Sequence, residues 1–243
     1  MIPTLRKLAR RLGLADRRCP VCGAVVHDPD AAFCPGCARD LAPRTGGYCP
    51  GCGRMSGREQ DPPTLCPKCR RKPPPWSRLH FHGRYDGPLR DLILSYKFNG
   101  FFGHARLLAD LADRAFGKNG GPVPDVIVPV PLHRLRLVRR GFNQSAELSR
   151  MLAKTLHRPV LKNGLSRIRY TVPQTRLDRH ERRANIKNAF AADPAQVRDK
   201  RVLLVDDVYT TGSTLRECAR TLQRAGADEV EALVLARAQR KQD

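Results

Sequence analysis

The 243-residue sequence lacks long apolar runs, a secretory signal pattern and a normal share of acidic residues. No stretch approaches the roughly 20 apolar residues that a transmembrane helix needs, so we expect no membrane span. Basic residues are scattered through the first 18 positions, which therefore lack the apolar core of a signal peptide and predict a cytoplasmic protein. The 45 Lys and Arg residues outnumber the 23 Asp and Glu residues, giving a formal net charge of +22. This imbalance favours a polyanionic ligand or partner, such as nucleic acid.

Histidine-based metal motifs are also missing, whereas cysteine is abundant. The seven histidines form neither an HxxxH nor an HExxH pattern. Eight of the nine cysteines lie between positions 19 and 69, in four C-x-x-C pairs with Pro or Gly inside or beside them. These cysteines are Cys19, Cys22, Cys34, Cys37, Cys49, Cys52, Cys66 and Cys69.

This spacing predicts two structural Zn²⁺ ions in a small tandem zinc ribbon. Two C-x-x-C turns supply the four thiolates of a closed tetrahedral site, and four turns supply two such sites. We expect pairing in sequence order, with an interleaved arrangement as the alternative. A disulfide framework is typical of oxidising compartments. A thioredoxin-like redox site needs a single C-x-x-C near a βαβ unit, so both alternatives fit less well.

Composition divides the chain into three parts. Residues 1–18 form a basic N-terminal segment, and residues 19–72 form the double zinc ribbon. Three consecutive prolines at 73–75 make a stiff, extended linker. The larger domain spans residues 76–243. Its first residue, the single tryptophan Trp76, is expected to pack between the two parts.

The larger domain alternates helical and strand patterns. Apolar residues at helical spacing predict four helices, and short continuous apolar runs predict three strands buried on both faces. Such runs also exclude disorder of the chain as a whole. We therefore expect an α/β fold with a parallel sheet that binds its ligand beyond the carboxyl ends of the strands. The helices are expected at 88–96, 103–116, 143–157 and 213–225, and the strands at 126–130, 202–205 and 230–235.

The strand at 202–205 leads into the most informative segment. Two adjacent carboxylates, Asp206 and Asp207, follow it directly and can accept hydrogen bonds from vicinal ribose hydroxyls or hold Mg²⁺ through water. A glycine- and hydroxyl-rich turn then opens a helix, where hydroxyls and backbone N–H groups suit a phosphate monoester. An ordinary N-cap at Ser213 is the alternative interpretation. The turn consists of Thr210, Thr211, Gly212, Ser213 and Thr214.

This segment resembles the signature with which type I phosphoribosyltransferases bind phosphoribosyl pyrophosphate (PRPP). The resemblance implies that Asp206 and Asp207 meet the ribose hydroxyls, that the turn holds the 5′-phosphate, and that Mg²⁺ binds together with PRPP. It also implies a pyrophosphate loop after an earlier strand, here residues 129–134 and the basic residues that follow. The candidate residues of this loop are Pro131, His133, Arg134, Arg140, Asn143 and Gln144.

Nearly the whole chain is similar to the competence protein F (ComF) family. The similarity rests on the paired cysteine knuckles and on several spaced motifs in one order: Tyr85-Asp86-Gly87-Pro88-Leu89-Arg90, Lys97-Phe98, Val128-Pro129-Val130-Pro131-Leu132-His133, Arg140-Gly141-Phe142-Asn143-Gln144, and Gln174 through Arg182 to Asn185. Members of this family are linked to uptake of single-stranded DNA in natural transformation, and are often described as amidophosphoribosyltransferases.

Much of the positive charge is concentrated in residues 133–187, which hold 15 Lys and Arg residues against three Asp and Glu residues. The part after residue 166 lacks a clean period and is expected to form a mobile loop. Basic groups there would neutralise the charge that develops on leaving pyrophosphate, and a closing loop would exclude water. A strip that follows a nucleic-acid backbone and a merely solvated basic surface are the alternatives. The candidate loop residues are Arg167, Arg169, Gln174, Arg182 and Asn185.

Two functions fit these patterns. The first is a PRPP-binding phosphoribosyltransferase-fold protein that transfers the phosphoribosyl group to a nitrogen acceptor and releases pyrophosphate, although the sequence identifies no general base. The second is a non-catalytic protein that handles single-stranded DNA with the DNA-uptake machinery, with PRPP as a regulatory ligand. Met1 is not followed by Cys, and the cysteines before residue 70 are expected to bind zinc. We therefore expect no glutaminase nucleophile in this chain.

Overall fold

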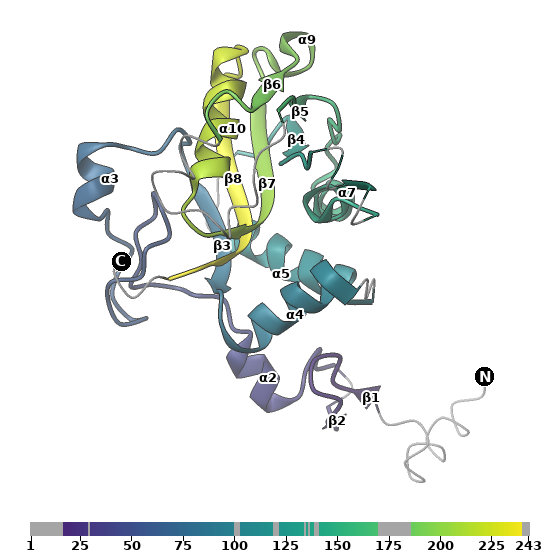
Figure 1. The fold of residues 1–243 in the computed structure, drawn as a ribbon. Coiled ribbons are helices and arrows are strands. Elements are labelled where there is room, and N and C mark those ends of the chain that lie inside the picture. Colours follow the sequence, from purple (N-terminus) through teal and green to yellow (C-terminus); the bar gives the residue numbers. More distant parts are fainter. Residues whose placement is uncertain are drawn as a thin grey trace.

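Four parallel strands form the central sheet of the computed structural model, in the order β3-β8-β7-β4 (Figure 1). Their bounds are Leu79–Arg84 for β3, Val126–Pro129 for β4, Arg201–Tyr209 for β7 and Glu229–Arg237 for β8. The predicted fold class, a parallel-sheet α/β domain preceded by a small tandem ribbon, is confirmed. The structure describes residues 17–28, 30–99, 103–118, 122–133, 135, 137–138, 141–169 and 186–239.

Helices cover both faces of this sheet (Figure 1). Helix α10 (Ser213–Arg224) packs on one face, and α4 (Gly87–Asn99), α5 (Gly103–Lys118) and α7 (Gln144–Leu156) pack on the other. All four lie within a few residues of the positions that apolar spacing predicts. None of the described helices has both the length and the apolarity needed to cross a bilayer.

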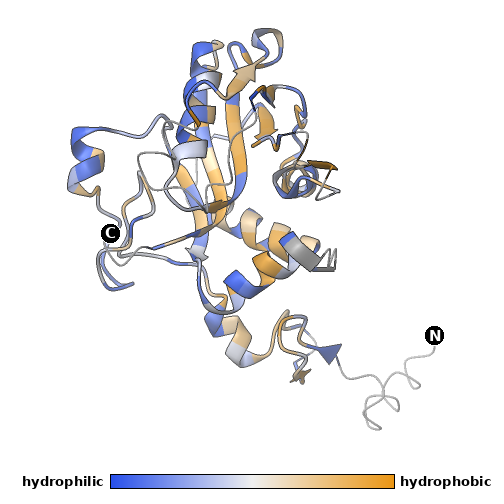
Figure 2. Ribbon diagram, viewed as in Figure 1, coloured by the Kyte–Doolittle hydropathy of each residue, from blue (hydrophilic) through white to orange (hydrophobic). Residues whose placement is uncertain are grey.

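The strands are buried on both faces, as continuous apolar runs predict. In β7, Val202 and Leu204 belong to the core beneath α10, whereas Leu203 and Val205 belong to the core beneath α5 and α7. Successive side chains of a strand point to opposite faces, so one apolar run supplies both cores. The hydropathy colouring of Figure 2 shows the resulting apolar centre of the sheet.

Shorter elements surround this sheet and were not predicted, because runs of two to six residues carry no clear period. The first ribbon, which contains Cys19 to Cys37, contributes β1 (Arg17–Arg18), β2 (Val25–Val26) and α2 (Pro35–Asp40). The second ribbon, which contains Cys49 to Cys69, contributes α3 (Pro67–Arg71). Near α10, β5 (Leu165–Arg167) pairs antiparallel with β6 (Phe190–Ala192), which leads into α9 (Pro194–Val197).

Strand β7 is longer than the predicted run of 202–205. It continues to Tyr209 because β8 remains paired with it up to the register pair Tyr209 and Arg237. Asp206 and Asp207 therefore belong to the strand itself rather than to the turn that follows it.

The sequence pattern of β3 does not predict a strand, because two of its residues are histidines. Both are buried and have partners from distant segments. The Nε2 atom of His80 lies 2.8 Å from a carboxylate oxygen of Glu231, and that of His82 lies 2.8 Å from the Leu41 carbonyl oxygen. Burial lowers the pKa of His82, so its neutral form is favoured in this core.

The two ribbons contribute to different hydrophobic cores, one on each side of the sheet. Cys19 and Cys37 of the first ribbon share a hydrophobic core with α4 and α5. All four cysteines of the second ribbon share a core with α10. Trp76 is 5% exposed and donates a hydrogen bond from Nε1 to the Gly51 carbonyl oxygen at 2.8 Å, which ties the second ribbon to the sheet domain.

Candidate functional site

Asp206 and Asp207 lie at the point of β7 where its neighbour β4 ends. Strand β4 pairs with β7 only as far as Pro129, which lies opposite Val205. Strand β8 continues beside β7 to Tyr209. Both aspartates are partly buried on the carboxyl side of the sheet, which is the edge where parallel α/β sheets bind their ligands.

Two side chains from different helices hold these carboxylates. The Ser145 hydroxyl, in the first turn of α7, donates a hydrogen bond to Oδ1 of Asp206 at 3.0 Å. The Lys97 ammonium, near the end of α4, forms an ion pair with Oδ2 of Asp207 at 2.7 Å. The Asp207 N–H also donates to Oδ1 of Asp206 at 2.9 Å. The two carboxylates are therefore oriented before any ligand binds.

Ser145 and Lys97 were not among the predicted site residues. The signal that could have found them is their position in or beside two motifs of the family resemblance. Lys97 begins the Lys97-Phe98 motif, and Ser145 directly follows Gln144. Neither motif indicates by itself that its neighbour reaches β7.

Burial raises the pKa of Asp206 to about 7, and the neighbouring Asp207 carboxylate adds to this effect. The Asp207 N–H, the Lys97 ammonium and the Ser145 hydroxyl act in the opposite direction. A carboxyl that changes its charge near neutral pH is typical of functional sites. Ligands that supply hydroxyl donors or positive charge favour its ionised form.

The turn after β7 requires a glycine at position 212. Gly212 has a φ of +73°, and a Cβ atom there would lie 2.3 Å from a ring carbon of Tyr209. The Gly212 carbonyl oxygen accepts a hydrogen bond from the N–H of Arg216, and this bond forms part of the first turn of α10. The Thr211 and Ser213 hydroxyls lie 3.0 Å apart. The turn thus brings hydroxyl groups to a helix N-terminus, an arrangement that suits an anion.

The predicted pyrophosphate loop is described in part. Pro131 and His133 follow β4, while Arg134 and Arg140 lie outside the described residues. The Asn143 side chain caps α7 by accepting the Ser145 N–H, and it donates to the Val130 carbonyl oxygen at 3.1 Å. Gln144 is buried and donates to the Lys97 carbonyl oxygen at 3.5 Å. These contacts connect the loop to α7 and α4, and the pyrophosphate role of the loop stays a prediction.

The predicted mobile loop begins at β5. Arg167 places its guanidinium over the Phe190 ring, 5.4 Å from the ring centre. Arg169 donates to the Lys187 carbonyl oxygen at 2.7 Å. Gln174, Arg182 and Asn185 lie outside the described residues.

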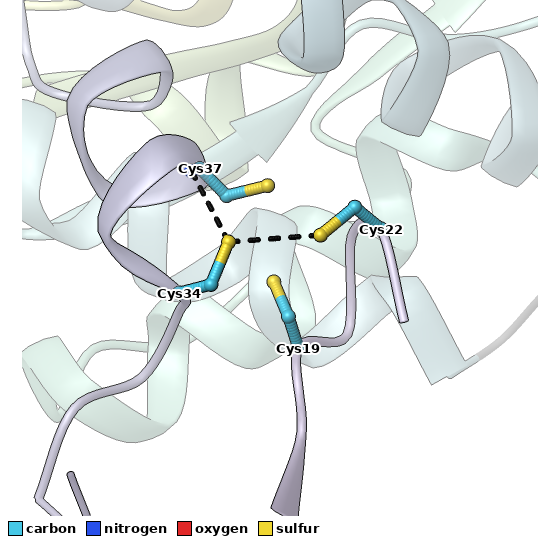
Figure 3. Close-up of side chains that lie close together, drawn as sticks. All are labelled: Cys19, Cys22, Cys34 and Cys37. Atoms are coloured by element: carbon cyan, nitrogen blue, oxygen red, sulfur yellow. Dashed lines mark hydrogen bonds between the residues drawn. The ribbon is translucent and has the colours of Figure 1, made fainter. Parts of the chain in front are cut away.

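The eight clustered cysteines form two groups of four in sequence order, as predicted. The first group contains Cys19, Cys22, Cys34 and Cys37, and the second contains Cys49, Cys52, Cys66 and Cys69. Figure 3 shows the four thiols of the first group converging from two loops and the start of α2. Within each group all ligand atoms lie within 4.8 Å of one another.

The sulfur spacing fits zinc. Sulfurs about 2.3 Å from a tetrahedral Zn²⁺ ion lie about 3.8 Å from each other. The Cys22 and Cys34 sulfurs are 3.6 Å apart in the first group, and the Cys52 and Cys66 sulfurs are 3.8 Å apart in the second. Backbone N–H groups point at the sulfurs as well, since the Cys66 N–H donates to Cys49 Sγ at 3.3 Å. Both groups therefore fit structural Zn²⁺ sites with no position left for a substrate.

The two groups differ in exposure. Cys22 is exposed and Cys34 partly so, whereas all four cysteines of the second group are buried. In the second group, the hydrogen bond between Cys49 and Cys52 lowers the pKa of the Cys49 thiol to about 4 and raises the pKa of the Cys52 thiol. The thiols thus share protons that a bound zinc ion would displace.

Comparison with known proteins gives matches to both parts of the chain. A family model described as a phosphoribosyl transferase domain matches residues 106–243, which is more than half of the chain, and one described as a double zinc ribbon domain matches residues 14–70. "Competence protein F" of Haemophilus influenzae is 39% identical over 179 residues, covering 71% of this chain and 78% of that protein. "DNA utilization protein YhgH" of Escherichia coli strain K12 is 40% identical over 176 residues, covering 71% and 77%. "Competence protein ComFC" of Bacillus subtilis is 28% identical over 142 residues, covering 58% and 56%.

Proposed function

The chain belongs to the competence protein F family, and from this membership and the geometry at the end of β7 we propose that it binds PRPP together with Mg²⁺. One observation carries the proposal. Two adjacent carboxylates lie just past the end of β4, oriented by Lys97 and Ser145, and a glycine turn that opens α10 follows them. The match to a phosphoribosyl transferase domain covers this whole segment.

The two parts of the site, the carboxylates and the turn, bind different groups of the ligand. Asp206 and Asp207 accept hydrogen bonds from the ribose hydroxyls, since vicinal hydroxyls match two adjacent carboxylates. The turn from Thr210 to Thr214 holds the 5′-phosphate with its hydroxyls and with the N–H groups at the start of α10. The carboxylate oxygens of Asp206 and Asp207 also fit Mg²⁺. When bound, this ion offsets part of the negative charge of pyrophosphate.

The reaction that this arrangement supports is phosphoribosyl transfer. A nitrogen nucleophile forms a bond to C1 of the ribose while the bond from C1 to the pyrophosphate oxygen breaks, and the bonding electron pair leaves with pyrophosphate. The proton lost by the nitrogen passes to solvent, because the described residues offer no assigned general base. Basic side chains of the loop after β4, with Arg134 and Arg140 as candidates, stabilise the charge on the leaving group.

Isothermal titration calorimetry with PRPP and Mg²⁺ tests this proposal. The wild type should release heat on binding, and Asp206→Asn and Asp207→Asn should each weaken binding at least tenfold, because hydrogen bonds to a charged acceptor contribute roughly 1.5–3 kcal/mol. Asp91→Asn is the matched control, since Asp91 is 72% exposed on α4 and pairs with Arg90. Equal heats for wild type and the two site variants would refute the proposed site. No heat from the wild type would refute PRPP binding itself.

A second candidate function is the handling of single-stranded DNA. It is favoured by the names of the relatives, which refer to competence and DNA utilization, and by the basic composition of residues 133–187. Neutralising Arg167 and Arg169 to Gln should weaken DNA binding and lower its salt dependence. The control neutralises Arg220 and Arg224, two exposed arginines of α10. Binding that does not depend on salt, or is absent at low salt, would contradict this function.

The two functions are separated by a turnover screen. Pyrophosphate release from PRPP is measured across nitrogen acceptors, with and without single-stranded DNA. Release that depends on an acceptor supports transfer. PRPP binding without release, combined with a change in DNA affinity, supports the regulatory role of PRPP.

A further inference from the structure

Arg237 connects the second cysteine cluster to the proposed phosphate turn. It is the last residue of β8 and is 5% exposed. Its Nε donates a hydrogen bond to the Cys52 carbonyl oxygen at 2.9 Å. Its Nη1 donates to the Thr210 carbonyl oxygen at 3.0 Å and contacts the Ala238 carbonyl oxygen. One buried guanidinium therefore bridges a metal-ligand residue and the first residue of the turn.

The ring of Tyr209 extends this connection to Gly212. The Arg237 guanidinium lies over the Tyr209 ring, 4.6 Å from its centre. The same ring occupies the space where a Cβ atom of Gly212 would lie. The aliphatic part of Arg237 lies against the second ribbon, since a Cβ atom on Gly53 would meet its Cγ at 3.2 Å. Displacing Arg237 would therefore change the position of the Tyr209 ring, which packs against Gly212 of the turn.

Trp76 forms a second connection between the same two segments. Its indole Nε1 donates to the carbonyl oxygen of Gly51, which lies between Cys49 and Cys52. Its ring packs edge-on against the Tyr209 ring, with centres 6.0 Å apart. The Arg216 guanidinium, from the first turn of α10, lies 5.1 Å from the centre of the indole. Two carbonyl groups of residues 49–53 are thus hydrogen-bonded to side chains that pack against Tyr209.

The geometry of residues 49–53, called the knuckle below, depends on the metal. Cys49 and Cys52 belong to the same group of four thiols, so a bound ion fixes the positions of both ends of this segment. The Gly53 N–H donates to the Cys49 carbonyl oxygen at 2.7 Å, which closes the turn. The Cys52 carbonyl that anchors Arg237 is therefore oriented by the metal site. The first cysteine group packs in the other core, with α4 and α5.

We propose that Arg237 is a positioning residue that couples the second zinc site to the phosphate turn, so that zinc in this site and PRPP at the turn stabilise each other. The ligand half of this inference rests on the proposed function. Coupling of this kind is reciprocal, because each ligand must change the affinity of the other by the same factor. Zinc bound to the first group is not part of the coupling.

The test measures the equilibrium competition for zinc between the full chain and a chromophoric chelator, with and without PRPP and Mg²⁺. The Cys22→Ser variant, which lacks a ligand of the first group, isolates the second zinc. PRPP should raise the affinity of the second site for zinc about tenfold, within the usual range of coupling energies. In Arg237→Met the effect of PRPP should disappear and PRPP affinity should fall about tenfold. Arg237→Lys should not restore the coupling, because an ammonium lacks the planar fork that reaches both carbonyls.

Arg84→Met is the matched control. Arg84 is the register partner of Arg237 on β3, and its side chain is 55% exposed. This variant should keep the effect of PRPP on zinc affinity. Hydrogen exchange of the peptide spanning residues 208–214 provides a readout without ligand, and it should be faster in Arg237→Met and after removal of the second zinc than in the wild type or Arg84→Met.

The outcomes separate this inference from the proposed function. If the wild type binds PRPP but the zinc affinity of its second site is unchanged, the coupling is refuted while PRPP binding stands. Coupling that survives in Arg237→Met, or that Arg237→Lys restores, refutes the positioning role. If the wild type does not bind PRPP, the proposed function fails and hydrogen exchange decides: faster exchange after zinc removal supports the connection between knuckle and turn, and unchanged exchange refutes it. Should Arg237→Met not fold, Arg237→Lys still tests the role of Arg237, and the wild-type and Cys22→Ser measurements still decide whether the two sites are coupled.

Discussion

Replacing Asp206 by Asn is expected to stabilise the ligand-free protein at neutral and alkaline pH, although it removes a proposed PRPP contact. Burial raises the pKa of Asp206 from its ordinary value of 3.8 to about 7. Between these two pH values the folded protein keeps a proton that the unfolded chain releases. The stability of the wild type therefore falls as pH rises through this window, and the penalty is complete about one pH unit above the folded pKa. Asn has nearly the shape of the protonated side chain and carries no such penalty.

The size of the effect follows from the pKa difference. About three pKa units at about 1.4 kcal/mol each give roughly 4 kcal/mol as an upper limit. Partial exposure of Asp206 allows solvent screening, which reduces this value. The part of the penalty that develops between about pH 6 and about pH 8 is about 1 kcal/mol. The difference in unfolding free energy between Asp206→Asn and the wild type should therefore be about 1 kcal/mol larger at about pH 8 than at about pH 6.

Urea unfolding at buffered free zinc measures this difference. Trp76 is the single tryptophan and is buried between the second ribbon and Tyr209, so its fluorescence reports unfolding of both parts. Asp125→Asn is the control of opposite sign, because the Arg201 N–H lowers the pKa of Asp125 and its loss should destabilise the protein at neutral pH. An Asp206→Asn variant whose stability relative to wild type does not change with pH would refute the reasoning.

Three further changes probe the site and the ribbons. In Lys97→Met the pKa of Asp206 should rise further, because the Lys97 ammonium lowers it; calorimetry across pH should show PRPP binding shifted to higher pH. Gly212→Ala should cost about 2 kcal/mol or more of unfolding free energy in urea, because its Cβ would overlap the Tyr209 ring at a positive φ. In Cys22→Ser one of two zinc ions should be lost, together with the faster phase of release to a chelator, because Cys22 is the exposed ligand of the first group.

Each of these changes has a control within the chain. Lys97→Arg keeps the positive charge and should leave the pH of PRPP binding close to that of the wild type. Gly117 lies in α5, where the new Cβ atom would meet nothing within 4 Å apart from its chain neighbours and the adjacent helix backbone, so Gly117→Ala should raise stability by up to about 1 kcal/mol. Cys218 is a buried residue of α10 and lies outside both cysteine groups, so Cys218→Ser should keep two zinc ions. A destabilised Gly117→Ala or a one-zinc Cys218→Ser protein would contradict the assignments.

Features encoded by local spacing could be predicted from the sequence. The four C-x-x-C pairs place their thiols together because each turn is self-contained, and sequential pairing follows from the short distance along the chain between neighbouring turns. The helices at α4, α5, α7 and α10 carry apolar residues at helical intervals over 12 to 16 residues. Such patterns depend only on the spacing of residues within one segment, so they can be recognised without knowledge of tertiary contacts.

Features that depend on distant partners could not be predicted in the same way. Strand β3 contains buried histidines that are compatible with a core only because Glu231 and the Leu41 carbonyl accompany them. The extent of β7 depends on how far β8 runs beside it. Lys97 and Ser145 reach the two aspartates across 110 and 61 positions of sequence. None of these pairings leaves a local period, so sequence patterns identify the carboxylates but not the groups that orient them.

The two ribbons belong to different hydrophobic cores, which gives the two zinc sites different relations to the candidate site. Lys97 and Ser145 approach the aspartates from α4 and α7, which pack on the face shared with the first ribbon. The turn at Gly212 begins α10, on the face shared with the second ribbon, and Arg237 bonds directly to that ribbon. The contacts of the first ribbon with α4 lie in a hydrophobic core, which stabilises without orienting a ligand group. Directional hydrogen bonds join the second ribbon to the turn, so loss of its zinc should change ligand geometry, whereas loss of the first zinc should change stability.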